Sequence, residues 1–340
     1  MTISVTHVTA SDRYAGVEAH IRTLACAQAD AGLTVTVIGG DPKQMAPELG
    51  AHDVTFSPAR NTWELTRAIR TVHTDVIHSH LTAADTAAYL GTRLTHATIV
   101  STRHTPQHRG STPFRRTALR RVVSRAIAAE TAVSSYAAGF VDGPCTVIHA
   151  GVPVQPLVSA GERDQIILVA QRMEPEKATS EAVAIVARSG LLEAGWRLHI
   201  AGDGSQRPSI EDQINALGIA DRTYLLGRVA NVRELMLSVG LLVAPCPAEA
   251  YGLSVVEAMA SGLPAVASAA GGHLETVGAT TAQTLYPPGD VAAGARTLAG
   301  LAGDPTLRDR LGCALHDAQR EKFTVERQLD LTSQVYRSVL

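Results

Sequence analysis

Residues 245–264 read Pro-Cys-Pro-Ala-Glu-Ala-Tyr-Gly-Leu-Ser-Val-Val-Glu-Ala-Met-Ala-Ser-Gly-Leu-Pro, so Glu249 and Glu257 stand eight residues apart across a turn that contains Gly252. The pattern predicts a helix that starts near Ser254, with Glu257 on its first turn and Glu249 in the preceding loop. Both carboxylates can then face one site at the N-terminus of this helix. A solvated helix cap is the simpler alternative for the pair.

The same helix N-terminus is an expected anion site. The backbone N–H groups of Tyr251, Gly252 and Leu253 lie where the helix dipole is positive, an arrangement that favours a diphosphate. Carboxylates that touched a phosphate would repel it. Glu249 and Glu257 make better sense as acceptors of hydrogen bonds from hydroxyl groups beside the anion, such as those of a sugar or a ribose.

Composition narrows the class of protein. At 340 residues the chain is long enough for two domains, each with its own core. A formal net charge of −2 and 4% aromatic residues are not typical of nucleic-acid binding, so we expect no nucleic-acid partner. The cysteines lie far apart without Cys-x-x-Cys spacing, which indicates neither a disulfide framework nor a zinc site and favours a reducing, cytoplasmic setting.

We find no signal peptide pattern at the N-terminus and no run of 18 apolar residues long enough for a membrane span. The richness in Ala and Arg favours a bacterial source with a GC-rich genome.

Short β-branched runs alternate with stretches rich in Ala, Leu and Arg, the pattern of an α/β fold built on parallel sheets. The first half predicts strands at Ile3–Thr9, Thr34–Ile38, Val76–His78, Thr98–Thr102, Thr131–Ser134 and Cys145–Ile148. The second half predicts strands at Gln165–Ala170, Arg197–Ala201, Thr223–Leu226, Leu241–Ala244, Ala265–Ser268 and Gln283–Tyr286. Helices are expected between them, for example over Gly16–Ala31 and Thr82–Thr92.

The stretch from Gly151 to Gly161 contains two prolines and no charged residue, and it is typical of a connector between domains. We therefore expect one Rossmann-like α/β domain over residues 1–152, a second over residues 163–323, and a final helix over residues 324–340 that packs back towards the first domain. Two such domains face each other across a cleft, and open parallel sheets bind ligands beyond the carboxyl ends of their strands.

Two cations flank Pro175 where the first strand of the second domain gives way to a loop. Arg172 offers a planar fork and Lys177 a movable point charge, and together they suit a pyrophosphate. Surface pairing with Glu174 or Glu176 is the alternative.

Glycine turns end several of the predicted strands. The first strand is followed by Ala15-Gly16, where backbone N–H groups can approach a phosphate or sugar, although no Gly-x-Gly-x-x-Gly is present and an ordinary turn remains the alternative. Later turns contain Gly202 and the segment Gly227-Arg228-Val229. Such turns can hold a base by main-chain contacts, and most are only turns; Asp203 is most simply a turn residue.

These segments, taken together, resemble the retaining glycosyltransferases of family 4, which have the GT-B fold. The matching segments occur in the family's order and span nearly the whole chain. They are Gly16-Val-Glu18, Arg172 with Lys177, Gly202-Asp-Gly204, Gly227-Arg228-Val229, Glu249-Ala-Tyr-Gly252 through Glu257-Ala-Met-Ala-Ser-Gly262-Leu-Pro264, and Gly271-Gly272-His-Leu-Glu275.

The resemblance implies that residues 1–152 bind the acceptor and residues 163–323 the nucleotide-sugar donor. Glu249 and Glu257 are similar to the two acids of the family's Glu-x7-Glu motif, Glu249 at the donor sugar and Glu257 at the ribose. The catalytic group implied is Arg172, Lys177, Glu249 and His104, with His104 beside the transferred sugar. The donor-binding group implied is Gly16, Gly202, Arg228, Val229, Tyr251, Gly252, Leu253 and Glu257.

The chain departs from the family's pattern in two places. Ala15 replaces the first glycine of a frequent Gly-Gly pair, and Ala178 follows Lys177 where glycine is usual. Neither change removes a charge or an obligatory functional atom. They concern the geometry at the phosphates more than the activity.

The implied activity is that of a retaining hexosyltransferase, which moves a sugar from a nucleotide diphosphate donor such as a UDP-sugar to a hydroxyl of a glycan, a lipid or a small natural product. Arg172, Lys177 and the helix N-terminus stabilise the leaving diphosphate. No cofactor and no metal is expected, and the sequence contains no Asp-x-Asp. A nucleotide-sugar epimerase, a sugar phosphorylase and a degenerate nucleotide-sugar-binding partner protein are the alternatives.

Two further patterns leave alternatives open. His78 and His80 alternate on one predicted strand, so both can reach one face; a metal site, packing and polarity on the acceptor side are the interpretations. A basic helix face, opposite an apolar one, indicates either a surface helix or peripheral contact with an anionic membrane. Its members are Arg115, Arg116, Arg120, Arg121 and Arg125.

Overall fold

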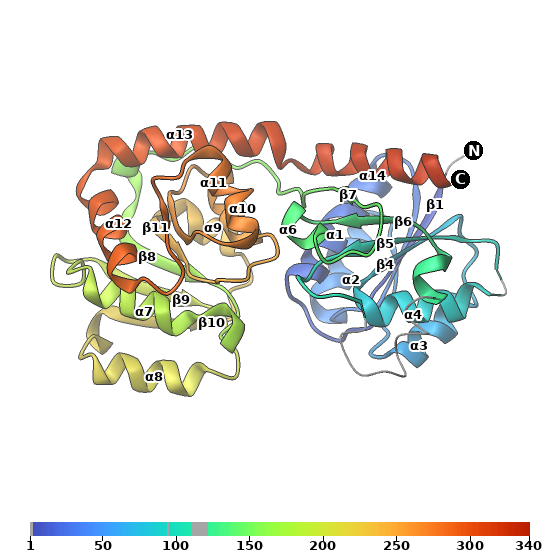
Figure 1. The fold of residues 1–340 in the computed structure, drawn as a ribbon, viewed down its shortest axis with the longest axis horizontal. Helices are drawn as coiled ribbons and strands as arrows, with labels where there is room; N and C mark the ends of the chain where they lie inside the picture. The colour runs from blue at the N-terminus through green and yellow to red at the C-terminus, as the bar shows by residue number, and fades with distance from the viewer. Residues whose placement is uncertain (1–2, 94, 110–121) are drawn as a thin grey trace. The chain divides into compact units, whose positions relative to one another are not determined.

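The structure is a computed structural model that describes residues 3–93, 95–109 and 122–340. The chain forms two compact units, one of residues 1–151 with 324–340 and one of residues 152–323. Each unit is built on a parallel sheet covered by helices (Figure 1), which confirms the predicted α/β fold class. Among the described residues no helix is both long enough and apolar enough to cross a membrane.

The N-terminal unit contains a seven-stranded sheet, within the described residues, in the order β3-β2-β1-β4-β5-β6-β7. Its strands are β1 (Ser4–Val8), β2 (Thr34–Ile38), β3 (Thr55–Ser57), β4 (Val76–His80), β5 (Thr98–Arg103), β6 (Ile127–Ala132) and β7 (Thr146–Val147). Its helices include α1 (Gly16–Asp30), α2 (Pro42–Ala51), α3 (Thr62–Ile69), α4 (Leu81–Thr92), α6 (Ser135–Ala138) and α14 (Val325–Val339).

Side chains alternate between the two faces of this sheet, as a pleated strand requires. In β4, Ile77 packs into the cluster that α3 and α4 cover, whereas its neighbour Val76 packs against Tyr336 of α14. Figure 1 shows α14 (red) beside the strands of this unit. The last helix therefore belongs to the core of the unit that the chain begins with.

The C-terminal unit contains a six-stranded parallel sheet in the order β10-β9-β8-β11-β12-β13. Its strands are β8 (Asp164–Ala170), β9 (Arg197–Ala201), β10 (Thr223–Gly227), β11 (Val239–Ala244), β12 (Ala265–Ser268) and β13 (Leu285–Tyr286). Its α-helices are α7 (Thr179–Arg188), α8 (Arg207–Ala216), α9 (Val232–Ser238), α10 (Leu253–Ala260), α11 (Val277–Thr280), α12 (Val291–Gly303) and α13 (Pro305–Lys322). Short 3-10 helices are η1 (Ala160–Glu162), η2 (Pro175–Lys177), η3 (Ala220–Arg222) and η4 (Gly271–Leu274).

Most predicted strands lie within two residues of the observed bounds, but two regions differ. The strand β3 was not predicted, because it has three residues and none of them is buried. The strand β6 begins at Ile127, a residue that the sequence pattern assigned to the basic helix. Pairing of Ile127 with Ile99 of β5 overrides the helical periodicity there.

The basic helix itself is described only at its end. Residues 122–126 are helical, and Arg125 is exposed. The predicted residues Arg115, Arg116, Arg120 and Arg121 lie outside the described residues. The membrane interpretation of this face stays a prediction.

Candidate active site

The segment from β11 to α10 has the expected form. Gly252 has a φ of 88° and caps the N-terminus of α10, which begins at Leu253. A Cβ atom on Gly252 would lie 2.9 Å from Cδ2 of His273, so both the positive φ and the close packing require glycine. Because the helix begins one residue before Ser254, Glu257 is its fifth residue and lies just beyond the first turn, a small correction to the prediction.

The two carboxylates differ in their surroundings. Glu257 lies on the side of α10 that also carries the partly exposed Leu253 and Ser254, whereas Val255 and Val256 are buried. Glu249 precedes the helix, and its carboxylate accepts a hydrogen bond from the backbone N–H of Tyr251. The Tyr251 amide, which was predicted to bind a phosphate, therefore has a carboxylate partner within this unit.

The closest charged contact at this segment joins Lys177 to Glu249. The Lys177 ammonium lies 2.6 Å from Oε2 of Glu249, and the two side chains are 20% and 18% exposed. Burial raises the pKa of Glu249, but Lys177 more than offsets that effect and holds it below its usual value. Two residues predicted separately thus form one ion pair.

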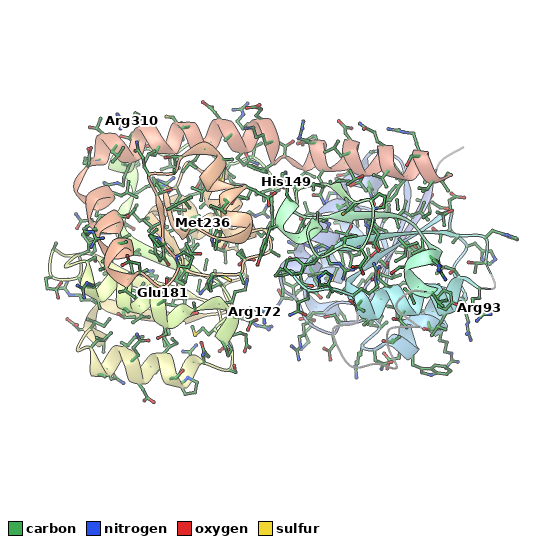
Figure 2. The ribbon with its side chains drawn as sticks, in the orientation of Figure 1. Arg93, His149, Arg172, Glu181, Met236 and Arg310 are labelled. Atoms are coloured by element: carbon green, nitrogen blue, oxygen red, sulfur yellow. The ribbon has the colours of Figure 1, made fainter. Side chains whose placement is uncertain are left out.

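Arg172, labelled in Figure 2, lies just beyond β8. Its guanidinium is 2.8 Å from the carboxylate of Glu176, and both side chains are about half exposed (48% and 56%). This is the surface pairing that the sequence left open as an alternative. An exposed pair of this kind contributes about 0.3–0.5 kcal/mol, so a bound anion can displace Glu176 at little cost.

The positions of these charges follow from the order of the strands. The sheet runs β10-β9-β8 in one direction and β11-β12-β13 in the other, so β8 and β11 are neighbours at the point where the order reverses. Arg172 and Lys177 follow β8, and Glu249 follows β11. Open α/β sheets bind their ligands at this point, beyond the carboxyl ends of the strands.

The predicted glycine turns have a structural explanation. A Cβ on Gly202, whose φ is 144°, would lie 1.9 Å from the carbonyl oxygen of Gln171, and one on Gly204 would lie 2.4 Å from that of Met173. Both glycines are needed because the segments that follow β8 and β9 approach each other closely. Asp203 accepts a hydrogen bond from the Gly204 amide, as a turn residue does. Arg228 is exposed and Val229 is partly exposed beyond β10.

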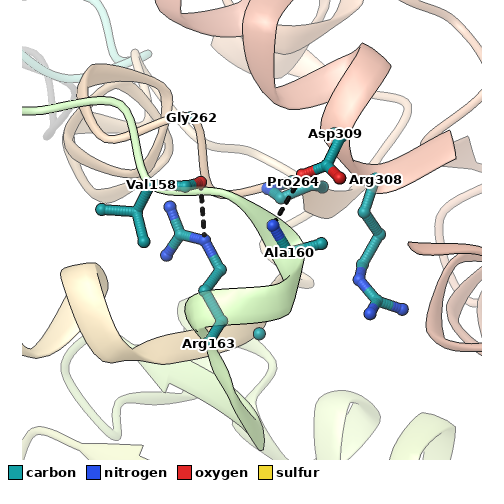
Figure 3. A pocket seen from close by; sticks show the side chains of 8 residues that line it. Val158, Ala160, Arg163, Gly262, Pro264, Arg308 and Asp309 are labelled. Carbon is teal, nitrogen blue, oxygen red and sulfur yellow. Dashed lines mark hydrogen bonds between the residues drawn. The ribbon is translucent and has the colours of Figure 1, made fainter. Parts of the chain in front are cut away.

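Another polar cluster of this unit is structural. Arg163 is 9% exposed and donates hydrogen bonds to the carbonyl oxygens of Met236, Val239 and Ser261. Figure 3 shows it beside Val158 and Ala160, at the end of the segment predicted to connect the domains. These bonds hold residues 158–163 against α10 and α13, since the Ala160 amide also donates to Asp309 of α13.

The N-terminal unit presents a second set of predicted residues. Its strand order reverses between β1 and β4; Gly16 follows β1, and His104 follows β5. A Cβ on Gly16 would meet no atom within 4 Å, so packing within the unit does not require glycine there. Ala15 has an extended backbone with φ −147°, which any residue adopts. Alanine therefore causes no backbone strain at this position, and the Ala15 amide donates a hydrogen bond to the Glu18 carboxylate.

His104 belongs to a cluster of histidines around the ends of β1, β4 and β5. Its Nε2 atom lies 2.9 Å from Nδ1 of His80, and the Nε2 atom of His80 lies 3.0 Å from Nδ1 of His7. His78 stacks on His80 with ring centroids 4.4 Å apart, and His20 of α1 contacts His104 edge-on at 4.7 Å. His104 is partly exposed and the other four are buried.

Burial keeps these imidazoles uncharged. It lowers the pKa of His7 to about 4, and burial together with the nearby His7 lowers the pKa of His20 to about 3. Burial and the neighbouring histidines hold the pKa values of His78, His80 and His104 well below their usual range. At neutral pH the cluster is a set of neutral donors and acceptors.

The metal interpretation of His78 and His80 now has further candidate ligands. Nitrogen atoms of His7, His78 and His80 lie within 4.8 Å of one another, as do those of His20, His80 and His104. The interplanar angles among His7, His78 and His80 are only 25–37°, so the rings are nearly stacked, and lone pairs in the planes of stacked rings do not converge on one point. The rings of His20, His80 and His104 are inclined by 42–84°, so stacking does not count against a metal at this second group, and the metal interpretation stays a prediction there.

Several residues at the two sites were missed from the sequence. His273 is buried, donates from Nδ1 to the Ser268 carbonyl and lies against Gly252; it stands in the Gly271–Glu275 segment already quoted. His7 and His20 gave no signal, since each is the single histidine of its element near the site. Lys177 was predicted, and it had one further signal that was not used: the chain contains only three lysines, at positions 43, 177 and 322.

Comparison with known families agrees with this fold. Residues 158–314 match the family described as glycosyl transferases group 1, and residues 14–155 match the family described as Glycosyltransferase Family 4. Each match covers less than half of the chain; one falls in the C-terminal unit and the other mainly in the N-terminal unit, so both units are similar to parts of known glycosyltransferases.

The chain is similar to curated bacterial enzymes over part of their length. It is 35% identical over 158 residues to the 2-deoxystreptamine N-acetyl-D-glucosaminyltransferase of Streptomyces fradiae, covering 45% of this chain and 34% of that protein. It is 36% identical over 138 residues to the 2-deoxystreptamine glucosyltransferase of Streptomyces kanamyceticus, covering 39% of this chain and 35% of that protein. The matched region is thus 34% and 35% of the length of these relatives.

Solved structures share the fold over almost the whole chain. The structure of Anabaena HepE in complex with UDP and glucose has a TM-score of 0.84 at 17% identity and covers 99% of this chain and 100% of that one. The sucrose-phosphate synthase of Thermosynechococcus elongatus has a TM-score of 0.77 at 20% identity and covers 99% of this chain and 98% of that one. At these identities the likeness concerns the fold.

Proposed function

We propose that this protein is a retaining, metal-independent glycosyltransferase that moves a sugar from a nucleotide diphosphate sugar to a hydroxyl acceptor. The observation that carries the proposal is the Lys177–Glu249 ion pair, which lies beside the N-terminus of α10 where the strand order of the C-terminal sheet reverses. This arrangement joins a fixed cation, a carboxylate acceptor and a helix dipole at one place.

The chemistry required is the stabilisation of a leaving diphosphate. As the bond to the anomeric carbon breaks, negative charge grows on the diphosphate and positive charge on the sugar ring. Lys177 supplies a partly buried ammonium, and Arg172 is released from Glu176 at little cost. Glu249 keeps its charge because Lys177 lies beside it, so it can accept hydrogen bonds from sugar hydroxyls.

We further propose UDP as the nucleotide and a small polyol or glycan hydroxyl as the acceptor. The complexes of Anabaena HepE with UDP and with UDP-glucose support the donor. The names of two relatives specify transfer to 2-deoxystreptamine, which supports a small hydroxylated acceptor. The absence of Asp-x-Asp from the sequence supports chemistry without a metal.

The test is donor turnover with product analysis. Wild-type protein, screened with UDP-sugars and hydroxyl acceptors, should release UDP, form a glycoside with the anomeric configuration of the donor, and keep its rate in EDTA. An inverted product would overturn the retaining mechanism, and loss of activity in EDTA would overturn metal independence. An epimerised sugar nucleotide formed without acceptor would overturn the assignment as a transferase.

Substitution of Lys177 tests the assigned site. Lys177→Ala should lower kcat/KM about 100- to 1,000-fold, as loss of one preorganised charged donor does. Glu249→Ala should also nearly abolish transfer. Because Lys177→Ala leaves a partly buried carboxylate unpaired, the double variant Lys177→Met with Glu249→Gln restores a neutral pair and should fold while remaining inactive. Lys322→Ala, which removes an exposed lysine of the same unit, is the matched control and should keep full activity.

A further inference from the structure

A continuous chain of hydrogen bonds runs through the core of the N-terminal unit and ends at His104. Each link joins one donor to one acceptor, and the atoms lie on β1, α1, β4, β5 and α14. The links are His104 Nε2 to His80 Nδ1 at 2.9 Å, His80 Nε2 to His7 Nδ1 at 3.0 Å, His7 Nε2 to Gln28 Oε1 at 2.7 Å, Gln28 Nε2 to Tyr336 Oη at 3.2 Å, Tyr336 Oη to His78 Nδ1 at 2.6 Å, and His78 Nε2 to Thr102 Oγ1 at 2.6 Å.

Gln28 sets the direction of the first half of the chain. With the Gln28 amide oriented as in this structure, its oxygen faces His7 and only accepts hydrogen bonds, so His7 carries its proton on Nε2 and accepts at Nδ1. His80 then donates from Nε2 and accepts at Nδ1. It follows that His104 donates from Nε2, which leaves its Nδ1 atom unprotonated.

The donors and acceptors in the second half of this hydrogen-bond chain are compatible with the first half. The Gln28 amide donates to Tyr336, whose hydroxyl donates to Nδ1 of His78. His78 donates from Nε2 to Thr102, whose hydroxyl shares a hydrogen bond with the hydroxyl of Thr131. His7, His80 and His78 are thus satisfied as neutral imidazoles, and an extra proton on Nδ1 of His7 or His80 would bring two N–H groups face to face.

We propose that Gln28, His7 and His80 are positioning residues that hold His104 as the neutral tautomer with its proton on Nε2, so that Nδ1 accepts a hydrogen bond from a hydroxyl of the transferred sugar. The inference rests on the proposed function for the identity of the ligand. The advantage of a neutral His104 is electrostatic, because a neutral imidazole does not repel a sugar ring that develops positive charge. Arg103, which precedes His104, further disfavours a proton on this ring.

The state of His104 is read directly by nitrogen NMR of the histidine rings. Uniformly ¹⁵N-labelled wild-type protein should show His104 with a protonated Nε2 and an unprotonated Nδ1, assigned by comparison with His104→Gln. Gln28→Met removes the acceptor that sets the direction and should mix the two tautomers of His104 without touching that residue. A proton on Nδ1 in the wild type, or an unchanged pattern in Gln28→Met, would overturn the proposal.

Steady-state kinetics test whether the neutral tautomer of His104 contributes to sugar transfer. His80→Leu removes the partner of His104 and should lower kcat about tenfold with the donor KM changed less than about twofold, as loss of a residue that orients a site ligand does. His80→Asn retains an acceptor close to the Nδ1 position and should restore most of kcat. His52→Leu, which removes a partly exposed histidine paired with Asp30 on the same unit, is the matched control.

Three outcomes separate the possibilities. If wild-type protein transfers no sugar from any donor but His104 shows the expected tautomer, the proposed function fails and the hydrogen-bond assignment stands. If His80→Leu, folded by circular dichroism, keeps wild-type kcat, the positioning role fails although transfer occurs. If purified protein contains one equivalent of zinc that is lost in His80→Leu, the cluster is a metal site and the proposal is overturned.

Discussion

The two units place polar groups at the same point of the same topology but with opposite electrostatics. In the N-terminal unit the strands around the reversal carry buried neutral imidazoles that bond to one another. In the C-terminal unit they carry a charged ammonium and carboxylate 2.6 Å apart. Both arrangements satisfy buried polar groups, the first by matching donors to acceptors and the second by matching charges.

The difference teaches how the same topology can carry two kinds of polar site. A neutral chain holds tautomers in place and adds no charge, which suits contact with an uncharged sugar or acceptor. A charged pair beside a helix dipole suits a diphosphate. The comparison also predicts that acid, anion binding and backbone substitutions affect the two units differently.

The largest expected difference is in acid stability. In the unfolded chain histidine has a pKa near 6.5, whereas burial lowers the pKa of His7 to about 4 and that of His20 to about 3. Below pH 6.5 the unfolded state therefore binds more protons, and the stability of the N-terminal unit, complete above pH 6.5, is lost as pH falls towards 4. For His7 alone the shift corresponds to about 3 kcal/mol.

Hydrogen exchange read by mass spectrometry at pH 7 and pH 5, corrected for the intrinsic rate, checks this prediction. Amides of β1 and β4 should lose protection at pH 5, while those of β8 and β11 should lose less. In the C-terminal unit burial also lowers the pKa of His273, but Glu249 opposes that shift. Equal losses in both units would show that the histidine cluster is not the source of the acid sensitivity.

The fold of both units was predictable because parallel strands buried on both faces leave continuous apolar runs. The run Val239–Ala244 is buried throughout, and its core was recognised. The three-residue β3 has no such run, and Ile127 continued a helical period that strand pairing overrode. Local patterns fail where an element is short or where a neighbouring strand decides the conformation.

The candidate sites were predictable residue by residue but not as contacts. Lys177 and Glu249 were identified separately, yet they are 72 residues apart, and their pairing depends on β8 and β11 being neighbours. His78 and His80 share a face because strand side chains alternate. His7 and His104 join them only through the order of β1, β4 and β5, which no local pattern encodes.

A smaller effect is expected at the exposed cation of the C-terminal unit. Arg172→Ala should lower kcat/KM for the donor about 10- to 100-fold, because a hydrogen bond to a charged group contributes about 1.5–3 kcal/mol. It should leave the free energy of unfolding within about 0.5 kcal/mol, since the pair with Glu176 is exposed. Steady-state kinetics and urea denaturation measure the two quantities.

Arg222 provides the matched control for this prediction. Its side chain is also about half exposed and lies 3.5 Å from Asp221, but Arg222 precedes β10 and so lies at the amino end of that strand. Arg222→Ala should not change the kinetics. If it lowers kcat/KM as much as Arg172→Ala, net charge and not the position at the carboxyl ends accounts for the effect.

The smallest effect concerns the backbone at the two alanines that stand where the resembling family uses glycine. Ala15 is extended, whereas Ala178 between η2 and α7 is left-handed, with φ 54° and ψ 39°. A left-handed alanine costs about 1–2 kcal/mol. Glycine removes this cost, but it also raises the conformational entropy of the unfolded chain, which cancels part of the gain in stability. Ala178→Gly should therefore stabilise the C-terminal unit by about 0.5 kcal/mol in urea denaturation followed by Trp196, which is buried in that unit.

The same substitution at Ala314, exposed within α13, should destabilise by about 0.5–1 kcal/mol, because glycine disfavours a helix interior. Opposite signs at the two positions would locate the strain in the backbone turn that follows Lys177, and equal signs would show that Ala178 carries no strain.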